Sequence, residues 1–217
     1  MPRPPADAPL LSRDLILERA LQRLREPGMP PLTWRGLSEE LKVKPSALYH
    51  YFPSKEALEQ AAYAEVLSQL PLPDVTGKRW QDQLYALAHD FRLLYQTYPG
   101  IAAHVFRPRE PLPQEHAIVE ALARALRSAG IRDPDLWTVA HTLIMFFASS
   151  FVLDLELGGP ETMRKRSQFT RQHAGTYPLL ASLPVPAASA SEEHFELITQ
   201  MLIAGVEGLA RRAGPAE

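Results

Sequence analysis

Apolar residues recur at helical spacing through most of the chain, and the first such stripe follows the N-terminal ten residues. Leu17, Ala20, Leu21 and Leu24 lie three or four positions apart, so a helix would place them on one face. Ser12 stands just before this stripe and is suited to cap the helix, because its hydroxyl can accept a hydrogen bond from a free N–H of the first turn. A helix beginning near residue 13 is therefore predicted.

Prolines and capping residues divide the next stretch into two short helices and a longer one. Thr33 is suited to cap the first short helix, and Pro45 occupies a first-turn position of the second. The second must end before Pro53, because a proline inside a helix removes a hydrogen bond and clashes with the preceding turn. Ser54 then caps a predicted connector helix over residues 55–70.

The remaining apolar stripes predict further helices and no strand. No stretch shows the sustained alternation of apolar and polar residues that a half-buried strand requires, so the expected fold class is all-α. The stretch 164–191 mixes a basic run with prolines and small residues, and a mobile loop is expected there. Helices are predicted over residues 78–98, 114–129, 135–157 and 192–212, with short helical turns near 101–106 and 177–183.

Charge is distributed unevenly along the 217 residues. Residues 1–55 contain nine Lys or Arg against six Asp or Glu, a balance of +3, while the remainder carries fourteen against nineteen, a balance of −5. The total is only −2, which argues against indiscriminate nucleic-acid binding. Any surface that faces DNA is therefore expected in the N-terminal quarter.

Composition excludes several kinds of chemistry and favours a soluble protein. The chain has no cysteine, so disulfides, thiolate metal sites and cysteine nucleophiles are excluded. The first ten residues lack the apolar core of a signal peptide, and the longest apolar run, 143–153, is too short to span a bilayer. No membrane association is expected, and a reducing cytoplasmic compartment is the simplest location.

The two short helices have the pattern of a helix-turn-helix. Leu37 and Leu48 can pack one helix against the other, which leaves Lys44, Tyr49 and His50 on the outer face. Such a pair places its second helix in the major groove of DNA.

The residues of this motif resemble the DNA-binding domain of the TetR family of transcription regulators. The resemblance rests on the Leu-Tyr-x-x-Phe-x-x-Lys-x-x-Leu string that runs from Leu48 to Leu58, preceded by Leu32-Thr33-Trp34-Arg35-Gly36-Leu37 and Leu41-Lys42-Val43. It implies a flexible arm over residues 1–11, a helix-turn-helix DNA-binding domain over 12–55, and a larger helical ligand-binding and dimerisation domain over 56–217. It also implies a homodimer that binds a double-stranded DNA operator and responds to a small molecule.

The resemblance assigns a role to each residue of the predicted DNA surface. Phosphate contacts would position the protein, whereas only contacts to base edges can confer sequence preference. Arg35 and Lys55 would bind phosphates, and Tyr49 would pack on the sugar-phosphate backbone. The full set of predicted DNA-binding residues is Trp34, Arg35, Lys44, Pro45, Ser46, Ala47, Tyr49, His50 and Lys55.

Two positions depart from the family pattern. Lys42 stands where the family usually has glycine, and a non-glycine residue at positive φ is strained. The alternative interpretation is an ordinary solvated lysine in the turn. Gly36 lies inside the preceding helix and weakens it by about 1 kcal/mol relative to alanine.

The C-terminal part resembles the tetracycline-repressor subgroup through Trp80-Gln81-Asp82, Phe91, His104 and Val152-Leu153-Asp154. In that subgroup a drug chelated to Mg²⁺ is held by a histidine and, through water, by an acid. His104 and Asp154 match those two positions, so the resemblance implies a candidate metal site there.

Other aligned positions argue against tetracycline itself as the ligand. The polar side chains that bind the drug are replaced here by residues at or near Leu87, Leu122, Phe146 and Pro71. Each lost hydrogen-bond partner would cost roughly 1 to 3 kcal/mol. We therefore expect a small apolar or aromatic effector and no required cofactor, with Mg²⁺ on a chelated ligand as the alternative.

The expected pocket is rich in aromatic side chains, although aromatic residues at helical spacing also occur in ordinary cores. Two helices, 135–157 and 192–212, are the expected dimer-forming pair by the same resemblance, and packing within one chain is the alternative. The predicted lining residues are Phe91, Tyr95, His104, Phe106, Trp137, His141, Phe147 and Phe151.

Two other functions remain open at this stage. An activator or a corepressor-dependent regulator of the same fold would share every motif above. A small helical enzyme using His104, His116, His141 and Asp154 is a remote alternative, because no nucleotide-binding loop, zinc-protease motif or nucleophile elbow occurs in the sequence. The chain is not expected to be an enzyme.

Overall fold

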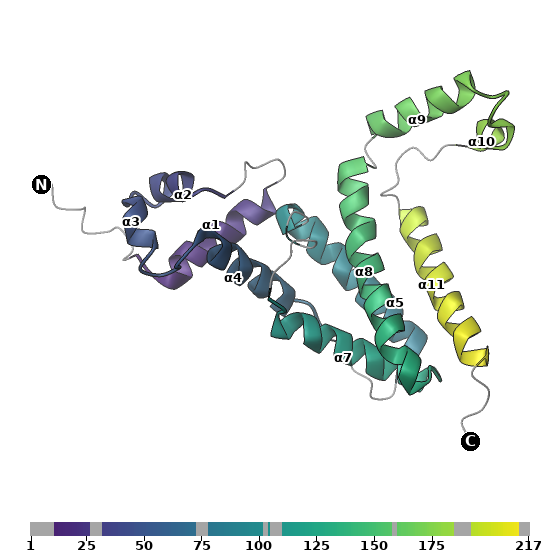
Figure 1. Cartoon of the computed structure of the whole chain (residues 1–217), viewed down its shortest axis with the longest axis horizontal. Coiled ribbons are helices and arrows are strands. Elements are labelled where there is room, and N and C mark those ends of the chain that lie inside the picture. Colours follow the sequence, from purple (N-terminus) through teal and green to yellow (C-terminus); the bar gives the residue numbers. More distant parts are fainter. Residues whose placement is uncertain are drawn as a thin grey trace, which may run out of the picture. The chain divides into compact units, whose positions relative to one another are not determined.

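The computed structural model describes residues 11–26, 32–72, 78–101, 104, 110–157, 160–184 and 192–212, with the backbone alone at 150–157 and 160. Within these ranges the regular secondary structure is entirely helical, and no strand occurs (Figure 1). The predicted all-α fold is confirmed. The expected N-terminal arm lies outside the described residues, except for Leu11.

The described helices, except the one at 160–172, follow the predicted ranges closely. The longer ones begin and end within two residues of the predicted bounds, which is within the usual uncertainty of helix ends. In chain order they are α1 (Arg13–Arg25), α2 (Trp34–Glu40), α3 (Pro45–Leu48), α4 (Lys55–Ser68), α5 (Trp80–Thr97), the 3₁₀ turn η1 (Pro99–Ile101), α7 (Pro113–Ser128), α8 (Asp133–Leu157), α9 (Pro160–Gln172), α10 (Pro178–Ser182) and α11 (Glu192–Arg212).

The three predicted capping residues begin their helices. Ser12, Thr33 and Ser54 precede α1, α2 and α4, and each side-chain oxygen accepts a 3.1 Å hydrogen bond from the N–H three residues later. These bonds satisfy N–H groups that have no partner within the helix. The helix starts of the N-terminal part are therefore set by local sequence.

The chain divides into two compact units. The first comprises Met1–Leu70 and Leu94–Gln114, and the second comprises Pro71–Leu93 and Glu115–Glu217. Helix α5 begins in the second unit, while its last turn, from Leu94, belongs to the first.

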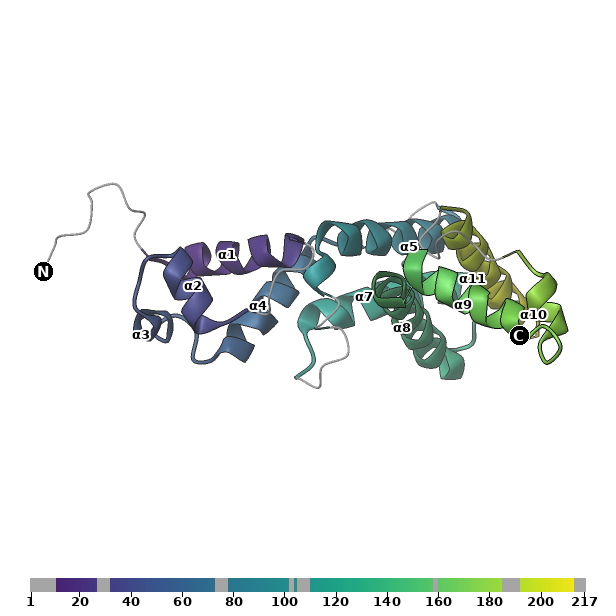
Figure 2. The ribbon, with the colours of Figure 1, turned by 90° about the horizontal axis from the view of Figure 1, so that it is seen from above.

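A small apolar core holds the N-terminal helices of the first unit together. Helix α1 packs against α4 and against η1, and α2 packs against α3 (Figure 2). Burial of these apolar side chains supplies the main stabilisation of the helices, because a helix of about two turns, such as α2, is too short to be stable alone. The buried members of this core are Ile16, Ala20, Leu37, Leu48, Phe52, Leu58 and Ala62.

In the second unit, α5 and α11 run antiparallel and are joined by polar contacts. Gln81 donates a 3.2 Å hydrogen bond to Glu207 near one end, and Arg92 pairs with Glu192 near the other. Between them the Tyr85 hydroxyl donates to Glu196, a bond that raises the pKa of that hydroxyl above its ordinary value.

The stretch predicted as a mobile loop contains a helix, so that prediction is wrong for its first part. Helix α9 covers its beginning, and α10, which matches the helical turn predicted at 177–183, packs against α9 (Figure 1). Glu161 in the first turn pairs with Arg164 and Lys165 one turn later. Such pairs support a helix that has no continuous apolar stripe, and this is why hydrophobic periodicity missed it.

None of the helices in the described ranges is long and apolar enough to cross a membrane.

Candidate nucleic-acid interface

Helix α2 ends in a tight turn that sets the direction of α3. The N–H of Val43 donates to the carbonyl of Ser38 at 2.9 Å, and the N–H of Lys42 donates to the carbonyl of Glu39 at 3.2 Å. This double closure is the Schellman motif, which requires a left-handed residue just after the helix. Lys42 is that residue, with φ of 55°.

The same motif occurs a second time in the chain, with glycine at the left-handed position. After α7, Ile131 donates to the carbonyl of Leu126 and Gly130 donates to that of Arg127, at 3.1 and 3.0 Å. Gly130 has φ of 93° and has no side chain to oppose this conformation. Lys42 therefore carries backbone strain that Gly130 avoids, as expected from the sequence.

Replacing Lys42 with glycine is expected to raise the free energy of unfolding by about 1 kcal/mol, because the left-handed penalty of a β-carbon is removed. The matched change Gly130→Ala is expected to lower it by a similar amount, since it introduces that penalty in the same motif. Urea unfolding followed by circular dichroism measures both changes. A Lys42→Gly protein that is no more stable than the wild type would contradict the assignment of strain.

Behind the turn, buried side chains fix the outward face of α3. Leu37 and Leu48 are fully buried between the helices, while Lys44, Ser46 and His50 are exposed. Pro45, at the first position of α3, is exposed as well, and Ala47 is half-buried. The predicted base-reading residues thus lie together on the short helix and at its two ends.

Two aromatic side chains extend this surface towards α2. Tyr49 is 53% exposed, and its ring meets the half-buried ring of Trp34 edge-on, with 5.3 Å between the ring centroids. This contact holds a large exposed ring in place at little entropic cost. Tyr49 is therefore available for packing on a sugar-phosphate backbone.

The two predicted phosphate-binding cations each have a carboxylate partner one turn away. Arg35 pairs with Glu39 at 2.9 Å on the surface, and the hydrogen bond to Glu39 raises the pKa of the guanidinium. The Lys55 ammonium lies 3.3 Å from the buried carboxylate of Glu59. Glu59 thus orients Lys55, whereas Glu39 would share Arg35 with a phosphate.

Sequence patterns did not reveal a link between α1 and α2. The guanidinium of Arg23 donates to the Glu40 carboxylate, with 3.1 Å between Nε and Oε1. A β-carbon on Gly36 would lie 3.1 Å from Arg23 Nη2, so glycine leaves room for this guanidinium. The pairing joins residues far apart in sequence, and no local sequence motif predicts it.

Tyr51 and Phe52 divide between the surface and the core. Phe52 is buried, and the guanidinium of Arg13 lies 4.8 Å from the centre of its ring. Tyr51 is 37% exposed, and its hydroxyl donates a 2.6 Å hydrogen bond to the carbonyl of Leu11. The end of α3 is thereby tied to the residue that precedes the cap of α1.

The predicted effector-binding residues are distributed over both units. Phe91 and Phe147 are buried together in the second unit, with ring centroids 6.1 Å apart. In the same unit, Trp137 is 60% exposed and stacks on His141 along α8. Both rings of this second pair are exposed in the described part of the chain.

The other predicted lining residues that the structure describes lie in the first unit. Tyr95 is buried in the first unit, and His104 lies there beside the ring of Tyr63, with 6.5 Å between centroids. Phe106 and the side chain of Phe151 lie outside the described residues. The assignment of these residues to an effector site stays a prediction.

A magnesium site of the kind implied by the resemblance needs several oxygen donors. Among the described side chains, no group of three or more histidine, aspartate or glutamate residues is placed to hold a metal ion. His104 faces an aromatic ring, and the side chain of Asp154 lies outside the described part. The metal site at His104 and Asp154 stays a prediction.

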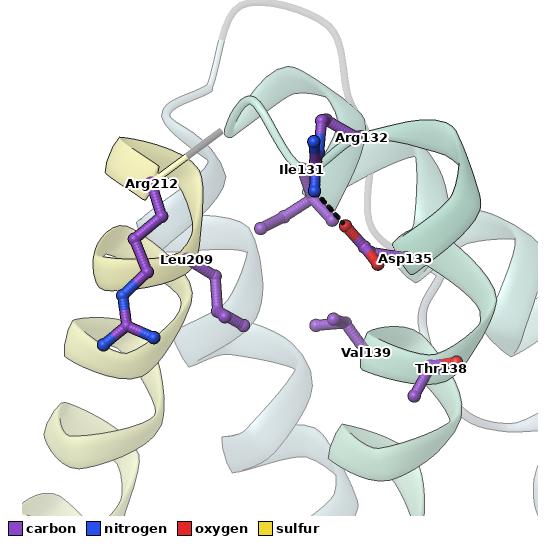
Figure 3. A pocket seen from close by; sticks show the side chains of 7 residues that line it. All are labelled: Ile131, Arg132, Asp135, Thr138, Val139, Leu209 and Arg212. Carbon is purple, nitrogen blue, oxygen red and sulfur yellow. Dashed lines mark hydrogen bonds and ion pairs between the residues drawn. The ribbon is translucent and has the colours of Figure 1, made fainter. Parts of the chain in front are cut away.

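A groove of about 400 Å³ lies between the start of α8 and the end of α11 (Figure 3). Two arginines and an aspartate rim it, and Arg132 is paired with Asp135 at 3.4 Å. None of the predicted effector residues contributes to it. Its lining consists of Ile131, Arg132, Asp135, Thr138, Val139, Leu209 and Arg212.

The outer face of α11 is apolar, and no side chain among the described residues covers it. Leu197 and Met201 are 58% and 65% exposed and lie four residues apart, which places them on one stripe. Gly205 and Gly208 continue the stripe, and a β-carbon at either position would meet nothing within 4 Å. A second helix could approach this face closely.

Comparison with protein families matches both parts of the chain. Residues 16–62 match the model described as "Bacterial regulatory proteins, tetR family", and residues 72–210 match "Tetracyclin repressor-like, C-terminal domain". The second match alone covers more than half of the chain.

Individual proteins are similar over nearly their whole length. The tetracycline repressor protein class C of Escherichia coli is 27% identical over 202 residues, which is 91% of each chain. The HTH-type transcriptional repressor DrrR1 of Streptomyces coeruleorubidus is 27% identical over 225 residues, covering 95% of this chain and 81% of that protein. The crystal structure of ActR from Streptomyces coelicolor with actinorhodin matches with a TM-score of 0.78 at 23% identity, over 96% of this chain and 99% of ActR.

Proposed function

The chain belongs to the TetR family of bacterial transcriptional regulators, and on this premise we propose that it is a cytoplasmic repressor that binds a palindromic operator as a homodimer. A small apolar or aromatic molecule releases it from the DNA. The observation that carries the proposal is the exposed surface of α3, where Lys44, Ser46, Tyr49 and His50 surround a helix anchored by buried leucines.

The surface of α3 has the chemistry that DNA recognition needs. Cations at Arg35, Lys44 and Lys55 neutralise phosphates, and counterion release makes such contacts the main source of affinity. Ser46 and His50 carry donors and acceptors that can meet base edges in the major groove. A single α3 reads one half-site, so a palindrome requires two copies about 34 Å apart.

The stripe on α11 supports dimer formation. An exposed apolar row of Leu197 and Met201, continued by two glycines, is costly in water and suits close packing of helices. In a twofold dimer the same stripe meets its own copy, so one surface supplies both sides of the interface.

Two observations support an apolar effector. Phe91 and Phe147 place aromatic surface inside the second unit. Leu87 and Leu122, which the resemblance puts near polar drug-binding positions of the tetracycline repressor, are buried. One relative is named a tetracycline repressor, and ActR was solved in complex with actinorhodin, which supports a small-molecule effector in general. Release of DNA requires the effector to favour the non-binding state, not merely to bind tightly.

Selection of duplexes from a random library tests the proposal directly. The full-length protein is expected to enrich a palindrome and to behave as a dimer in light scattering at micromolar concentration. A monomer that enriches no palindrome would refute the DNA-binding part. The same complex is then challenged with a panel of aromatic compounds in the presence of a chelator.

Release of the duplex by a compound of this panel, with Mg²⁺ removed, is the expected result. If release occurs only with magnesium-chelating compounds and chelator abolishes it, the apolar effector is excluded. If a compound tightens DNA binding instead, the protein is a corepressor-dependent regulator.

A further inference from the structure

The ends of α1 and α4 are joined through the hydroxyl group of Tyr98. Tyr98 is 1% exposed and lies between the end of α5 and η1. Its oxygen accepts a 2.6 Å hydrogen bond from Arg25, in the last turn of α1, and donates a 2.9 Å bond to Gln69, which caps the end of α4. The Arg25 guanidinium also lies 4.8 Å from the centre of the Tyr98 ring.

The backbone next to Tyr98 lies directly on α1. A β-carbon added to Gly100 would lie 3.0 Å from the Cα and 3.2 Å from the carbonyl oxygen of Leu24. Glycine is needed for this close approach, because neither contact atom belongs to a flexible side chain. The position of Tyr98 relative to α1 is therefore fixed by packing as well as by its hydrogen bonds.

The two helices that Tyr98 joins also carry the DNA-reading surface. At the opposite end from Gln69, α4 begins at Lys55, and α1 and α4 enclose Leu48 of α3 in their common core. Fourteen helical residues span about 21 Å, so a small displacement at the Gln69 end becomes a tilt of the helix at the Lys55 end. A contact far from DNA can thus set the orientation in which α3 meets the DNA.

We propose that the Tyr98 hydroxyl is a positioning group that holds the ends of α1 and α4 together and so sets the spacing between half-sites that the protein accepts. The inference rests on the proposed function, because spacing matters only when two copies of α3 read one duplex. Tyr98 does not touch DNA in this role. It narrows the range of operators on which both copies fit at once.

The test uses the full-length Tyr98→Phe protein, which keeps the buried ring and loses both hydroxyl bonds. Affinity is measured for the selected palindrome and for versions with one base pair added or removed at the centre. Loss of the two bonds is expected to reduce the preference for the original spacing by about five- to tenfold. Affinity for an isolated half-site is expected to stay at the wild-type value.

Two variants of Gln69 separate positioning from packing. Gln69 is exposed, so its replacement leaves the core intact. Gln69→Leu removes the acceptor and is expected to relax the spacing preference as Tyr98→Phe does, whereas Gln69→Glu keeps an acceptor and is expected to retain the wild-type preference. Ser182→Ala, which deletes a hydroxyl bond to the carbonyl of Leu179 within α10, is the control and should change nothing.

Several results would overturn the inference. Equal weakening at every spacing in Tyr98→Phe would show that the hydroxyl only stabilises the fold, and an unchanged preference would show that it does not position the helices. If Tyr98→Phe fails to fold, the Gln69→Leu preference decides the question alone. A wild-type protein that binds no palindrome refutes the proposed function itself, and the spacing role falls with it.

Discussion

Replacing Met201 with glutamate is expected to leave the chain folded but monomeric and to weaken operator binding by about 100-fold or more. The side chain is 65% exposed within its own chain, so a carboxylate there meets no intramolecular obstacle. In a twofold interface, however, two carboxylates would be buried against apolar side chains without partners, at a cost of several kcal/mol. Analytical ultracentrifugation measures assembly, and fluorescence anisotropy measures operator affinity.

Leu93→Glu is the matched control for this prediction. Leu93 is 54% exposed and belongs to α5, not to the proposed α11 stripe, so a glutamate there should leave assembly and operator affinity unaltered. If Met201→Glu remains dimeric with full affinity, the α11 stripe is not the dimer interface, and another face must bring the two copies of α3 together.

Substitutions at His50 and Lys55 are expected to alter DNA binding in two different ways. His50→Ala removes an exposed ring at the end of α3 and should lower discrimination at one base-pair position by about 1 to 3 kcal/mol per half-site. Lys55→Ala should weaken binding to every sequence and reduce the salt dependence by about one released cation per subunit. Affinities on a panel of single-base operator variants, each at several salt concentrations, distinguish the two.

The effect of Lys55→Ala on DNA binding must be separated from its effect on folding. Lys55 lies against the buried carboxylate of Glu59, so its removal affects folding as well as phosphate binding. The double variant Lys55→Ala with Glu59→Gln avoids leaving the buried Glu59 carboxylate without Lys55. Glu59→Gln alone is the reference for this double variant. Equal losses on all operator variants from His50→Ala would show that His50 reads no base.

Capping residues and apolar stripes in the sequence predict the helices of this fold well where one face of the helix is buried in a core. The range 192–212 coincides with α11, and Ser12, Thr33 and Ser54 begin their helices, because caps and apolar stripes act over a few residues. Helix α9 escaped prediction because ion pairs on its surface, not an apolar stripe, support it. Pro160 followed by Glu161 was the available signal for its start.

In the candidate site too, features set by local sequence could be predicted, whereas contacts between distant residues could not. The outward direction of Lys44 and His50 follows from the local pattern of α2 and α3, so sequence reasoning could reach it. The bond between Arg25 and Tyr98 joins positions 73 residues apart, and only the tertiary structure brings them together. For the same reason aromatic spacing alone could not tell that Trp137 lies exposed on α8 while Phe91 is buried.

The shortness of α3 has a consequence for the selectivity of the protein in a genome. The helix has four residues, so it can offer only a handful of side chains to the bases of one half-site. A sequence that short recurs by chance throughout any chromosome, and a single subunit would be distributed among countless equivalent positions. In the proposed dimer, the information that singles out one operator would be held by the pair of subunits, so selectivity would depend on protein concentration relative to the dissociation constant of the dimer. At concentrations below that dissociation constant, the protein would lose its preference for the operator over other sequences before it lost its ability to bind DNA.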